Sequence, residues 1–280
     1  MSIEVRREDR VAILTINRPE ALNALSSALL EELRSELAAI ARDTSVGCLI
    51  LTGAGDKAFI AGADIGEMAT KTPLEARAYA ELGHECAGLL ETMQAPTIAA
   101  VNGYALGGGS EMALACDIRI CSENAVFGQP EVDLGIMPGW GATQRLARTT
   151  SMGFAKELIF TGRRVKADEA LARGLAQHVV PLEELMPKAL EMARNIAAKS
   201  PVAIAYAKES TNRALAGDLA TNYKVEADLF SILFSTEDAK EGLRAFTEKR
   251  APNFQGRSKW RASSSSTLGR IERCSMSLVT

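Results

Sequence analysis

Short aliphatic segments alternate with amphipathic ones over the first half of this chain, and this alternation limits its fold more than any other feature. The aliphatic segments have the length of strands and are Val11 to Ile16, Cys48 to Thr52, Ala58 to Ile60, Pro96 to Val101 and Asp117 to Cys121. The segments Ala21 to Ile40 and Leu74 to Met93 read as amphipathic helices, and in the first the apolar residues recur every three to four positions. Strands alternating with helices predict an α/β core, and their repeated order resembles successive turns of one spiral.

The character of the chain changes at Pro201. Helical periodicity then runs through Ala203 to Leu215, Leu219 to Phe234 and Asp238 to Phe246, without strand patterns. We therefore divide the chain into a spiral core, residues 1–200, and a helical region, residues 201–256, which serves either as a lid or as an assembly element. Residues 257–280 have no period and contain a serine run, which predicts a disordered tail.

Composition and charge exclude several classes of protein. Hydrophobic residues make up 47% of the chain and charged residues 24%, as in a globular protein with a substantial core. A net charge of −3 without a basic stripe argues against nucleic-acid binding. No uncharged apolar run approaches the length of about 18 residues that a membrane span needs. Five cysteines without a Cys-x-x-Cys pair, only two histidines and no signal-peptide core predict a cytoplasmic protein with free thiols and no metal site.

A run of three glycines, Gly107 to Gly109, lies at a predicted strand-to-helix junction. Glycine lets the backbone approach a ligand closely, and the N–H groups that begin a helix are free to bind an oxyanion or a phosphate. The run matches neither a dinucleotide-binding fingerprint nor a Walker loop. Tight packing of the helix on the strand would explain it equally well. A second small-residue loop, Ala61 to Asp64, could also offer an amide, but a turn in which Asp64 caps the next helix is the simpler interpretation.

Two glutamates stand where a functional carboxylate could lie. Glu111 follows the glycine run in an otherwise apolar short helix, and Glu131 follows a predicted strand end, where α/β proteins often place functional side chains. Each could instead be a solvated surface residue, which is the common state of glutamate. Trp140, within Pro138 to Gly141, could line a pocket or fill the core.

Taken together, these segments resemble the enoyl-CoA hydratase (crotonase) family. The likeness covers roughly residues 5 to 256 and is carried by Phe59 to Ile65, Ala99 to Glu111, Phe127 to Glu131 and Pro138 to Leu146. It implies a crotonase-like spiral of repeated ββα units with a C-terminal helical region that builds trimers, which usually pair into hexamers. It also implies a lyase of fatty-acid and lipid metabolism that adds water to trans-2-enoyl-CoA and gives 3-hydroxyacyl-CoA. The coenzyme A belongs to the substrate, and no separate cofactor is expected.

The resemblance assigns roles to individual residues. Glu111 and Glu131 match the family's two catalytic glutamates, and the backbone N–H groups of Ala63 and Gly108 would form an oxyanion hole. We expect Glu111 to act as base on the water and a protonated Glu131 to deliver the proton to C2. The residues expected to contact the substrate or its coenzyme A are Lys57, Ala61, Asp64, Ile65, Gly139, Trp140, Phe230, Phe246 and Lys249.

Two positions depart from many relatives. Gly66 stands where many of them carry a lysine near the adenine, so nucleotide binding would depend on other groups such as Lys57 or Lys249. Trp140 replaces a smaller residue of some relatives and would narrow the acyl pocket.

Glutamate at both matching positions favours hydration over the family's isomerases, hydrolases and decarboxylases, many of which keep only one of the two. An enoyl-CoA isomerase or an acyl-CoA hydrolase is the nearest alternative. A non-catalytic relative that binds acyl-CoA or RNA is another, but RNA affinity needs clustered Lys and Arg, and the acidic balance of this chain argues against it.

Overall fold

The structure is a computed structural model that describes residues 2–256, and the chain divides between Ala197 and Ala198 into two compact units. The strands, all in the first unit, are β1 (Ile3–Glu8), β2 (Val11–Ile16), β3 (Cys48–Gly53), β4 (Ala58–Ile60), β5 (Thr97–Val101), β6 (Tyr104–Leu106), β7 (Ile118–Ser122), β8 (Val126–Gly128), β9 (Arg164–Lys166) and β10 (His178–Val180). The helices of this unit are η1 (Pro19–Ala21), α1 (Ser27–Arg42), α2 (Ile65–Met68), α3 (Pro73–Thr92), α4 (Gly108–Ala115), η2 (Pro130–Leu134), α5 (Ala142–Thr149), α6 (Met152–Thr161), α7 (Ala167–Ala172) and α8 (Leu182–Ala197). The predicted tail, residues 257–280, lies outside the described residues.

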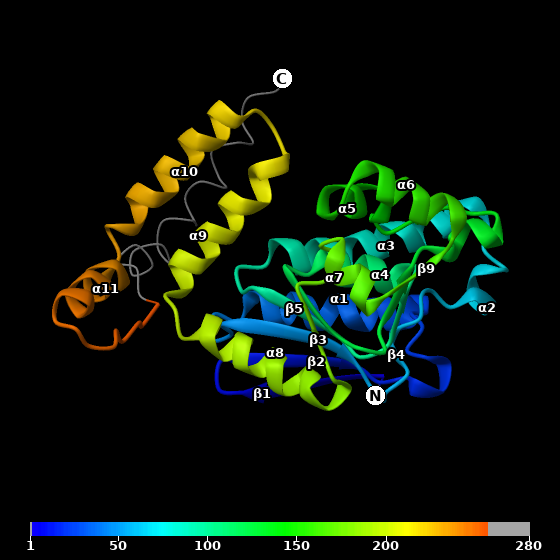
Figure 1. The fold of residues 1–280 in the computed structure, drawn as a ribbon, viewed down its shortest axis with the longest axis horizontal. Coiled ribbons are helices and arrows are strands. Elements are labelled where there is room, and N and C mark those ends of the chain that lie inside the picture. Colours follow the sequence, from blue (N-terminus) through cyan, green and yellow to red (C-terminus); the bar gives the residue numbers. More distant parts are fainter. Residues whose placement is uncertain (1, 257–280) are drawn as a thin grey trace, which may run out of the picture. The chain divides into compact units, whose positions relative to one another are not determined.

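The first unit winds as a spiral of ββα turns. Each turn adds one strand to a large sheet, of order β1-β2-β3-β5-β7-β10, and one strand to a small sheet, of order β4-β6-β8-β9. Thus β3 and β4 precede α2 and α3, and β5 and β6 precede α4 (Figure 1). From β2 to β10 the large sheet is parallel, because each return to it passes through a crossover that includes a helix. The α/β spiral predicted from the sequence is confirmed.

Apolar side chains cover both faces of the large sheet. On one face, Ile50, Ile98 and Ile120 pack with alanines of α8, whereas α1, α3 and α4 lie over the other face (Figure 1). Every residue of β3 is buried. A strand covered on both faces reads as a continuous apolar run, and this is why the central strands were predictable from the sequence.

The first long helix begins later than its sequence pattern predicted. α1 starts at Ser27, after the hydroxyl of Ser26 caps its first turn. The preceding Leu22 and Asn23 adopt left-handed backbone, with φ of 51° and 59°. The buried Asn23 side chain donates from Nδ2 to the carbonyl of Ala58 at 2.8 Å. This side chain therefore replaces a helical turn with a loop that holds β4 in place.

Arg119, buried at the start of β7, holds the carboxyl end of α4. Its guanidinium donates to the backbone carbonyls of Cys116 at 2.7 Å, Leu175 at 2.7 Å and Ala113 at 3.3 Å. Burial lowers the pKa of Arg119, but carbonyls at the negative end of a helix favour its charged form. Because α4 begins within the glycine run, this anchor fixes the helix whose first turn carries Gly108 and Glu111.

Replacement of Arg119 by Met should lower the free energy of unfolding by about 2–4 kcal/mol, because three buried carbonyls lose a charged donor. Urea unfolding followed by circular dichroism measures this loss. The matched control is Arg148→Met, at an exposed position on α5, which should change the free energy by less than about 0.5 kcal/mol. Equal urea midpoints for Arg119→Met and the parent protein would show that the anchor contributes nothing.

The second unit is helical in its described part. It contains α9 (Pro201–Asn212), η3 (Arg213–Leu215), α10 (Leu219–Leu233) and α11 (Glu237–Thr247), and α9 packs along α10. The buried Asp238 accepts from the backbone N–H of Gln255 at 2.8 Å and so ties the segment after α11 back to that helix. Among residues 2–256, no helix has both the length and the apolar character that crossing a membrane requires.

Candidate active site

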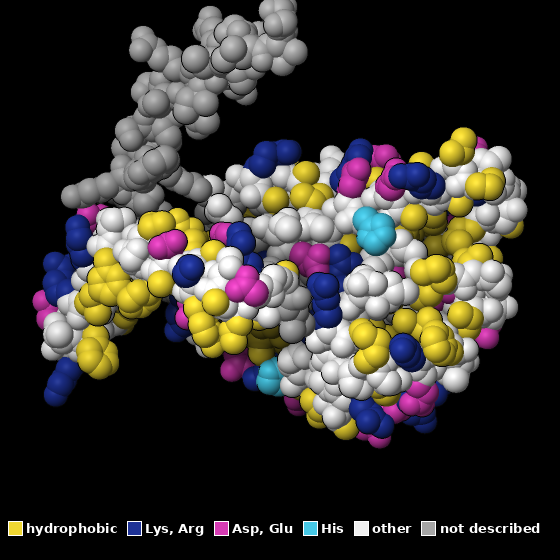
Figure 2. Space-filling model, turned by 90° about the horizontal axis from the view of Figure 1, so that it is seen from above, with side chains coloured by type: hydrophobic (Ala, Val, Ile, Leu, Met, Phe, Trp, Pro, Cys, Tyr) yellow, Lys and Arg dark blue, Asp and Glu magenta, His cyan; other side chains and the backbone are white. Residues whose placement is uncertain are grey.

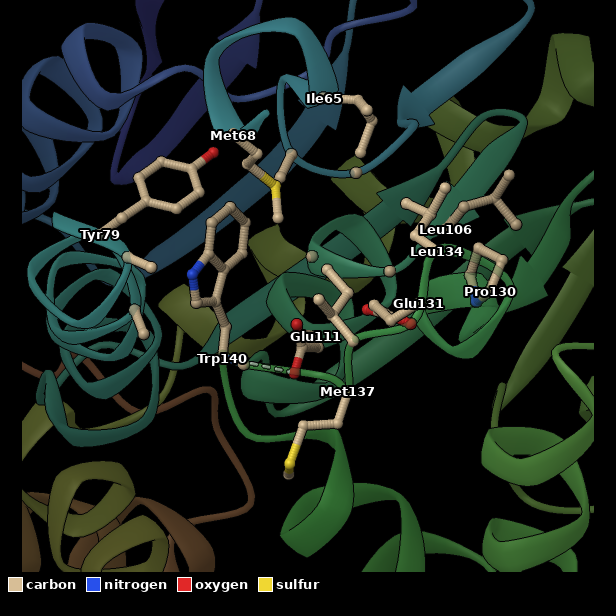
Figure 3. Close-up of a pocket in the computed structure, with 18 of the residues that line it drawn as sticks. Ile65, Met68, Tyr79, Leu106, Glu111, Pro130, Glu131, Leu134, Met137 and Trp140 are labelled. Atoms are coloured by element: carbon tan, nitrogen blue, oxygen red, sulfur yellow. Dashed lines mark hydrogen bonds between the residues drawn. The ribbon is translucent and has the colours of Figure 1, made fainter. Parts of the chain in front are cut away.

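A cavity of about 750 Å³ gathers most of the residues that the sequence singled out. Its walls come from the loop between β4 and α2, from α3, from the first turn of α4, from η2 and from the loop before α5 (Figure 3). The predicted site residues that line it are Ala61, Ala63, Ile65, Gly108, Glu111, Glu131, Gly139 and Trp140. The spiral brings these positions together because successive turns end at the same side of the small sheet.

Ala63 and Gly108 each place a backbone amide at this cavity. The N–H of Leu25 donates to the carbonyl of Gly62, and the N–H of Asp64 donates to the carbonyl of Leu25, both at 2.9 Å. This parallel bridge leaves the intervening Ala63 N–H on the other side of the strand. Gly108 opens α4, so the helix provides no acceptor for its N–H. Within residues 2–256 neither amide has a hydrogen-bond acceptor, and both are available to a ligand oxygen.

The glycine run has both roles that its sequence allowed: it permits close packing of α4, and it brings a backbone amide to the cavity. Gly107 has a φ of 51°, and a Cβ on it would lie 2.9 Å from Oε1 of Glu131. A Cβ on Gly109 would lie 1.8 Å from the carbonyl oxygen of Ile60, so close packing also requires glycine there. The tight packing brings the amide of Gly108 up to the cavity.

Glu111 is held from behind by two backbone donors. Its side chain is nearly fully buried, and Oε1 accepts from the N–H of Trp140 at 2.8 Å (Figure 3). The same oxygen also accepts from the N–H of Ala142 at 2.8 Å. Burial raises the pKa of Glu111, while these two donors and the charge of Arg145 oppose the rise. The donors favour the carboxylate form and fix its direction toward the cavity.

Glu131 lies in a different electrostatic environment. It is half-buried in η2, and burial, reinforced by the charge of Glu111, raises its pKa to about 7. The amide of the buried Gln129, oriented to donate, lies 3.1 Å from Oε1 of Glu131, and its own oxygen accepts from the hydroxyl of Ser110 at 3.1 Å. The two carboxyl groups face the same space, and burial raises the pKa of both, while backbone donors that favour the charged form are aimed at Glu111 (Figure 3).

Arg145 fixes the loop that supplies the donors for Glu111. Its Nη1 donates to the carbonyl of Trp140 at 2.7 Å, and its Nε and Nη2 bind both oxygens of Glu91 at 2.7 and 2.6 Å. A two-point ion pair of this kind holds the guanidinium in one orientation. The loop before α5 is therefore attached to α3, to which Glu91 belongs.

Several predicted contact residues lie elsewhere. The side chain of Lys57 is exposed in the turn between β3 and β4, outside the residues that line the cavity. Asp64 caps α2 and pairs with Arg18 at 3.0 Å, also outside that lining. Phe230, Phe246 and Lys249 are exposed in the second unit, and their contact with a substrate stays a prediction.

Much of the apolar wall was not predicted from the sequence. These residues are Met68, Tyr79, Leu106, Leu134 and Met137. Tyr79 belongs to the periodic apolar stripe of α3, where a pocket residue cannot be told from a core residue. The others lie in short elements whose position depends on the spiral as a whole.

The cavity combines two free amides with two carboxyl groups whose pKa values are raised by burial. Amides aimed at one point stabilise an oxygen that gains negative charge during a reaction. The carboxyl groups can take a proton from one atom and deliver one to a neighbouring atom. An apolar wall around them suits an acyl chain.

Comparison with known proteins agrees with this geometry. The model of the enoyl-CoA hydratase/isomerase family matches residues 6–257, almost the whole chain. The chain belongs to the enoyl-CoA hydratase/isomerase family.

Two relatives illustrate how similar the chain is to proteins of this family. It is 50% identical over 249 residues to the short-chain-enoyl-CoA hydratase of Clostridium acetobutylicum, covering 89% of this chain and 95% of that protein. It is 46% identical over 253 residues to the crotonyl-CoA hydratase of Syntrophomonas wolfei, covering 90% and 97%.

Solved structures of the family share the fold. The enoyl-CoA hydratase of Bacillus anthracis matches with a TM-score of 0.89 at 43% identity, over 92% of this chain and all of that one. A Geobacillus kaustophilus enoyl-CoA hydratase structure matches with a TM-score of 0.87 at 42% identity, over 92% and 99%. The crotonase fold expected from the sequence is thereby confirmed for this family member.

Proposed function

We infer that the chain is an enoyl-CoA hydratase, a lyase that reversibly adds water to trans-2-enoyl-CoA and forms 3-hydroxyacyl-CoA. One observation carries the inference: Glu111 and Glu131 line the same cavity as the unpaired amides of Ala63 and Gly108. The names of the two bacterial relatives support it. An isomerase moves a proton with a single base, whereas hydration uses both carboxyl groups.

The proposed mechanism follows the charge that develops during the reaction. Water attacks C3 of the enoyl group, and electron density moves through C2 onto the thioester oxygen. The amides of Ala63 and Gly108 stabilise that oxygen, and one such donor is typically worth about 3–4 kcal/mol. Glu111 accepts a proton from the attacking water, and Glu131 donates a proton to C2. These groups supply every proton transfer, so the proposal includes no cofactor besides the coenzyme A of the substrate.

A spectrophotometric assay with crotonyl-CoA tests the proposal. The absorbance of the conjugated enoyl thioester should fall, and mass spectrometry should detect 3-hydroxybutyryl-CoA as the product. Release of free coenzyme A would indicate a hydrolase instead. Migration of a double bond in 3-enoyl-CoA without any addition of water to crotonyl-CoA would indicate an isomerase.

The pKa of Glu131 gives the reaction a predicted pH dependence. Glu131 must carry a proton to donate it, so kcat/KM for crotonyl-CoA should fall as the pH rises through about 7. Rates measured from pH 5.5 to 9, with the enzyme incubated at each pH and then assayed at pH 6.5 to confirm its stability, provide the check. A constant kcat/KM up to pH 9 would contradict the assignment of Glu131 as the proton donor.

We also propose that copies of the chain associate as a trimer or hexamer through the second unit. In its described part this unit exposes large apolar side chains that water would otherwise surround, namely Leu219, Tyr223, Phe230, Phe234, Leu243 and Phe246. Hydrophobic side chains gather on this unit in Figure 2. On the face drawn there, basic and acidic side chains are interspersed, which gives no support to RNA binding.

A cytoplasmic location completes the proposal. Within residues 2–256, the thiols of Cys86 and Cys121 are buried and form no disulfide. Unpaired thiols of this kind are typical of a reducing compartment.

A further inference from the structure

The inner end of the cavity is closed by the indole of Trp140. Trp140 and Tyr79 are only 4% and 6% exposed, and their rings meet edge to face, with centroids 5.3 Å apart. The indole fills a slot between α3 and α4. A Cβ on Gly83 or on Gly108 would come within 2.3 or 2.1 Å of its ring atoms. Glycine on both sides thus makes room for the ring, and close packing prevents it from moving aside.

The outer end of the same cavity is open to solvent. Ile65, Leu134 and Met137 line it and are 50%, 55% and 64% exposed. The nucleotide part of coenzyme A is large and highly charged, so it must remain at this open end. A thioester whose oxygen lies at Ala63 and Gly108 therefore directs its acyl chain inward, toward Trp140.

The inner end cannot easily open by movement of the nearby loop. Glu67 of α2 accepts from the backbone N–H of Ser27 at 2.8 Å and pairs with Lys71 at 2.6 Å. Lys71 also lies 4.7 Å from the ring centre of Tyr79. These contacts fasten the connection between α2 and α3 to the start of α1 and to the aromatic pair.

We infer that Trp140 sets the upper limit of acyl-chain length and restricts this enzyme to short-chain 2-enoyl-CoA substrates. The inference rests on the proposed hydratase function. The backbone N–H of Trp140 holds Glu111, so the indole begins beside the reacting carbons and meets the first carbons beyond C3. A methylene that does not fit a pocket typically costs about 10–200-fold in kcat/KM, so a rigid wall at this depth discriminates strongly.

The test compares kcat/KM of the parent enzyme and Trp140→Ala for 2-enoyl-CoA substrates of four, six, eight and ten carbons. The parent should prefer crotonyl-CoA, and the substitution should raise the eight-to-four-carbon ratio by about 10-fold or more. An unchanged ratio in a variant that still hydrates crotonyl-CoA would overturn the inference. If the parent hydrates no enoyl-CoA of any length, the hydratase function itself is wrong.

A second variant keeps the test decisive if Trp140→Ala does not fold. Ala80 of α3 also lines the cavity, and Ala80→Leu should narrow it and lower the six-to-four-carbon ratio by about 10-fold. Ala78→Leu is the matched control, because Ala78 is exposed on the same helix and does not line the cavity. A six-to-four-carbon ratio in Ala80→Leu equal to that of Ala78→Leu would also overturn the inference.

Discussion

Replacement of Glu111 by Gln should lower kcat for the hydration of crotonyl-CoA by about 10²–10⁴-fold. The amide oxygen of glutamine can still accept from the N–H groups of Trp140 and Ala142, so the side chain keeps its place. What is lost is the ability to take a proton from water. Because substrate contacts are preserved, KM should change little.

Steady-state kinetics and circular dichroism together check this expectation. The matched control is Glu123→Gln, at an exposed position after β7 that does not line the cavity. The control should retain the parent rate. A kcat within about threefold of the parent in folded Glu111→Gln would remove this carboxylate from the mechanism.

Replacement of Glu131 by Gln should have two opposite effects: a similar loss of activity and a gain in stability at alkaline pH. In the folded protein the pKa of Glu131 is about 7, above its ordinary value of 4.5. The folded state therefore retains a proton that the unfolded state loses between pH 4.5 and 7, and over this range Glu131 makes the protein progressively less stable. Above pH 7 the ionised, half-buried carboxylate costs about 2 kcal/mol, after allowance for its partial exposure. Glutamine carries no charge and avoids this cost.

Urea unfolding at pH 5 and at pH 8 separates the two effects. Glu131→Gln should be about 2 kcal/mol more stable than the parent at pH 8 and nearly equal to it at pH 5. Glu123→Gln should follow the parent at both pH values. If Glu131→Gln shows no excess stability at pH 8, burial does not raise the pKa of Glu131 as the structure indicates.

The sequence predicted those parts of the fold that local pattern determines. The buried strand Cys48–Gly53 reads as an unbroken apolar run, and α3 shows a helical period in its sequence. By contrast, β1 was missed because it lies at an edge and exposes most of its side chains. The residues Leu22 and Asn23 continue an apparent helical pattern, yet tertiary hydrogen bonds of Asn23 place them in a loop.

The candidate site was predictable to a different degree. Motif likeness singled out Glu111, Glu131 and the two amides, and the structure places all four at one cavity. It could not reveal that Arg145 pairs with Glu91 of α3 or that Tyr79 packs on Trp140. Both contacts join segments more than 50 residues apart, and nothing in the local sequence of either segment records its partner.

In the loop before α5, the backbone N–H of Trp140 binds Glu111, and the side chain of the same residue lines the acyl pocket. The N–H of residue 140 exists whatever amino acid stands there, so evolution can exchange the indole for a smaller group without releasing the carboxylate. Selectivity for acyl-chain length and the placement of the catalytic carboxylate thus depend on one short segment, but the first can change without the second. A library at this single position could therefore generate hydratases of different chain-length preference that share one set of catalytic groups.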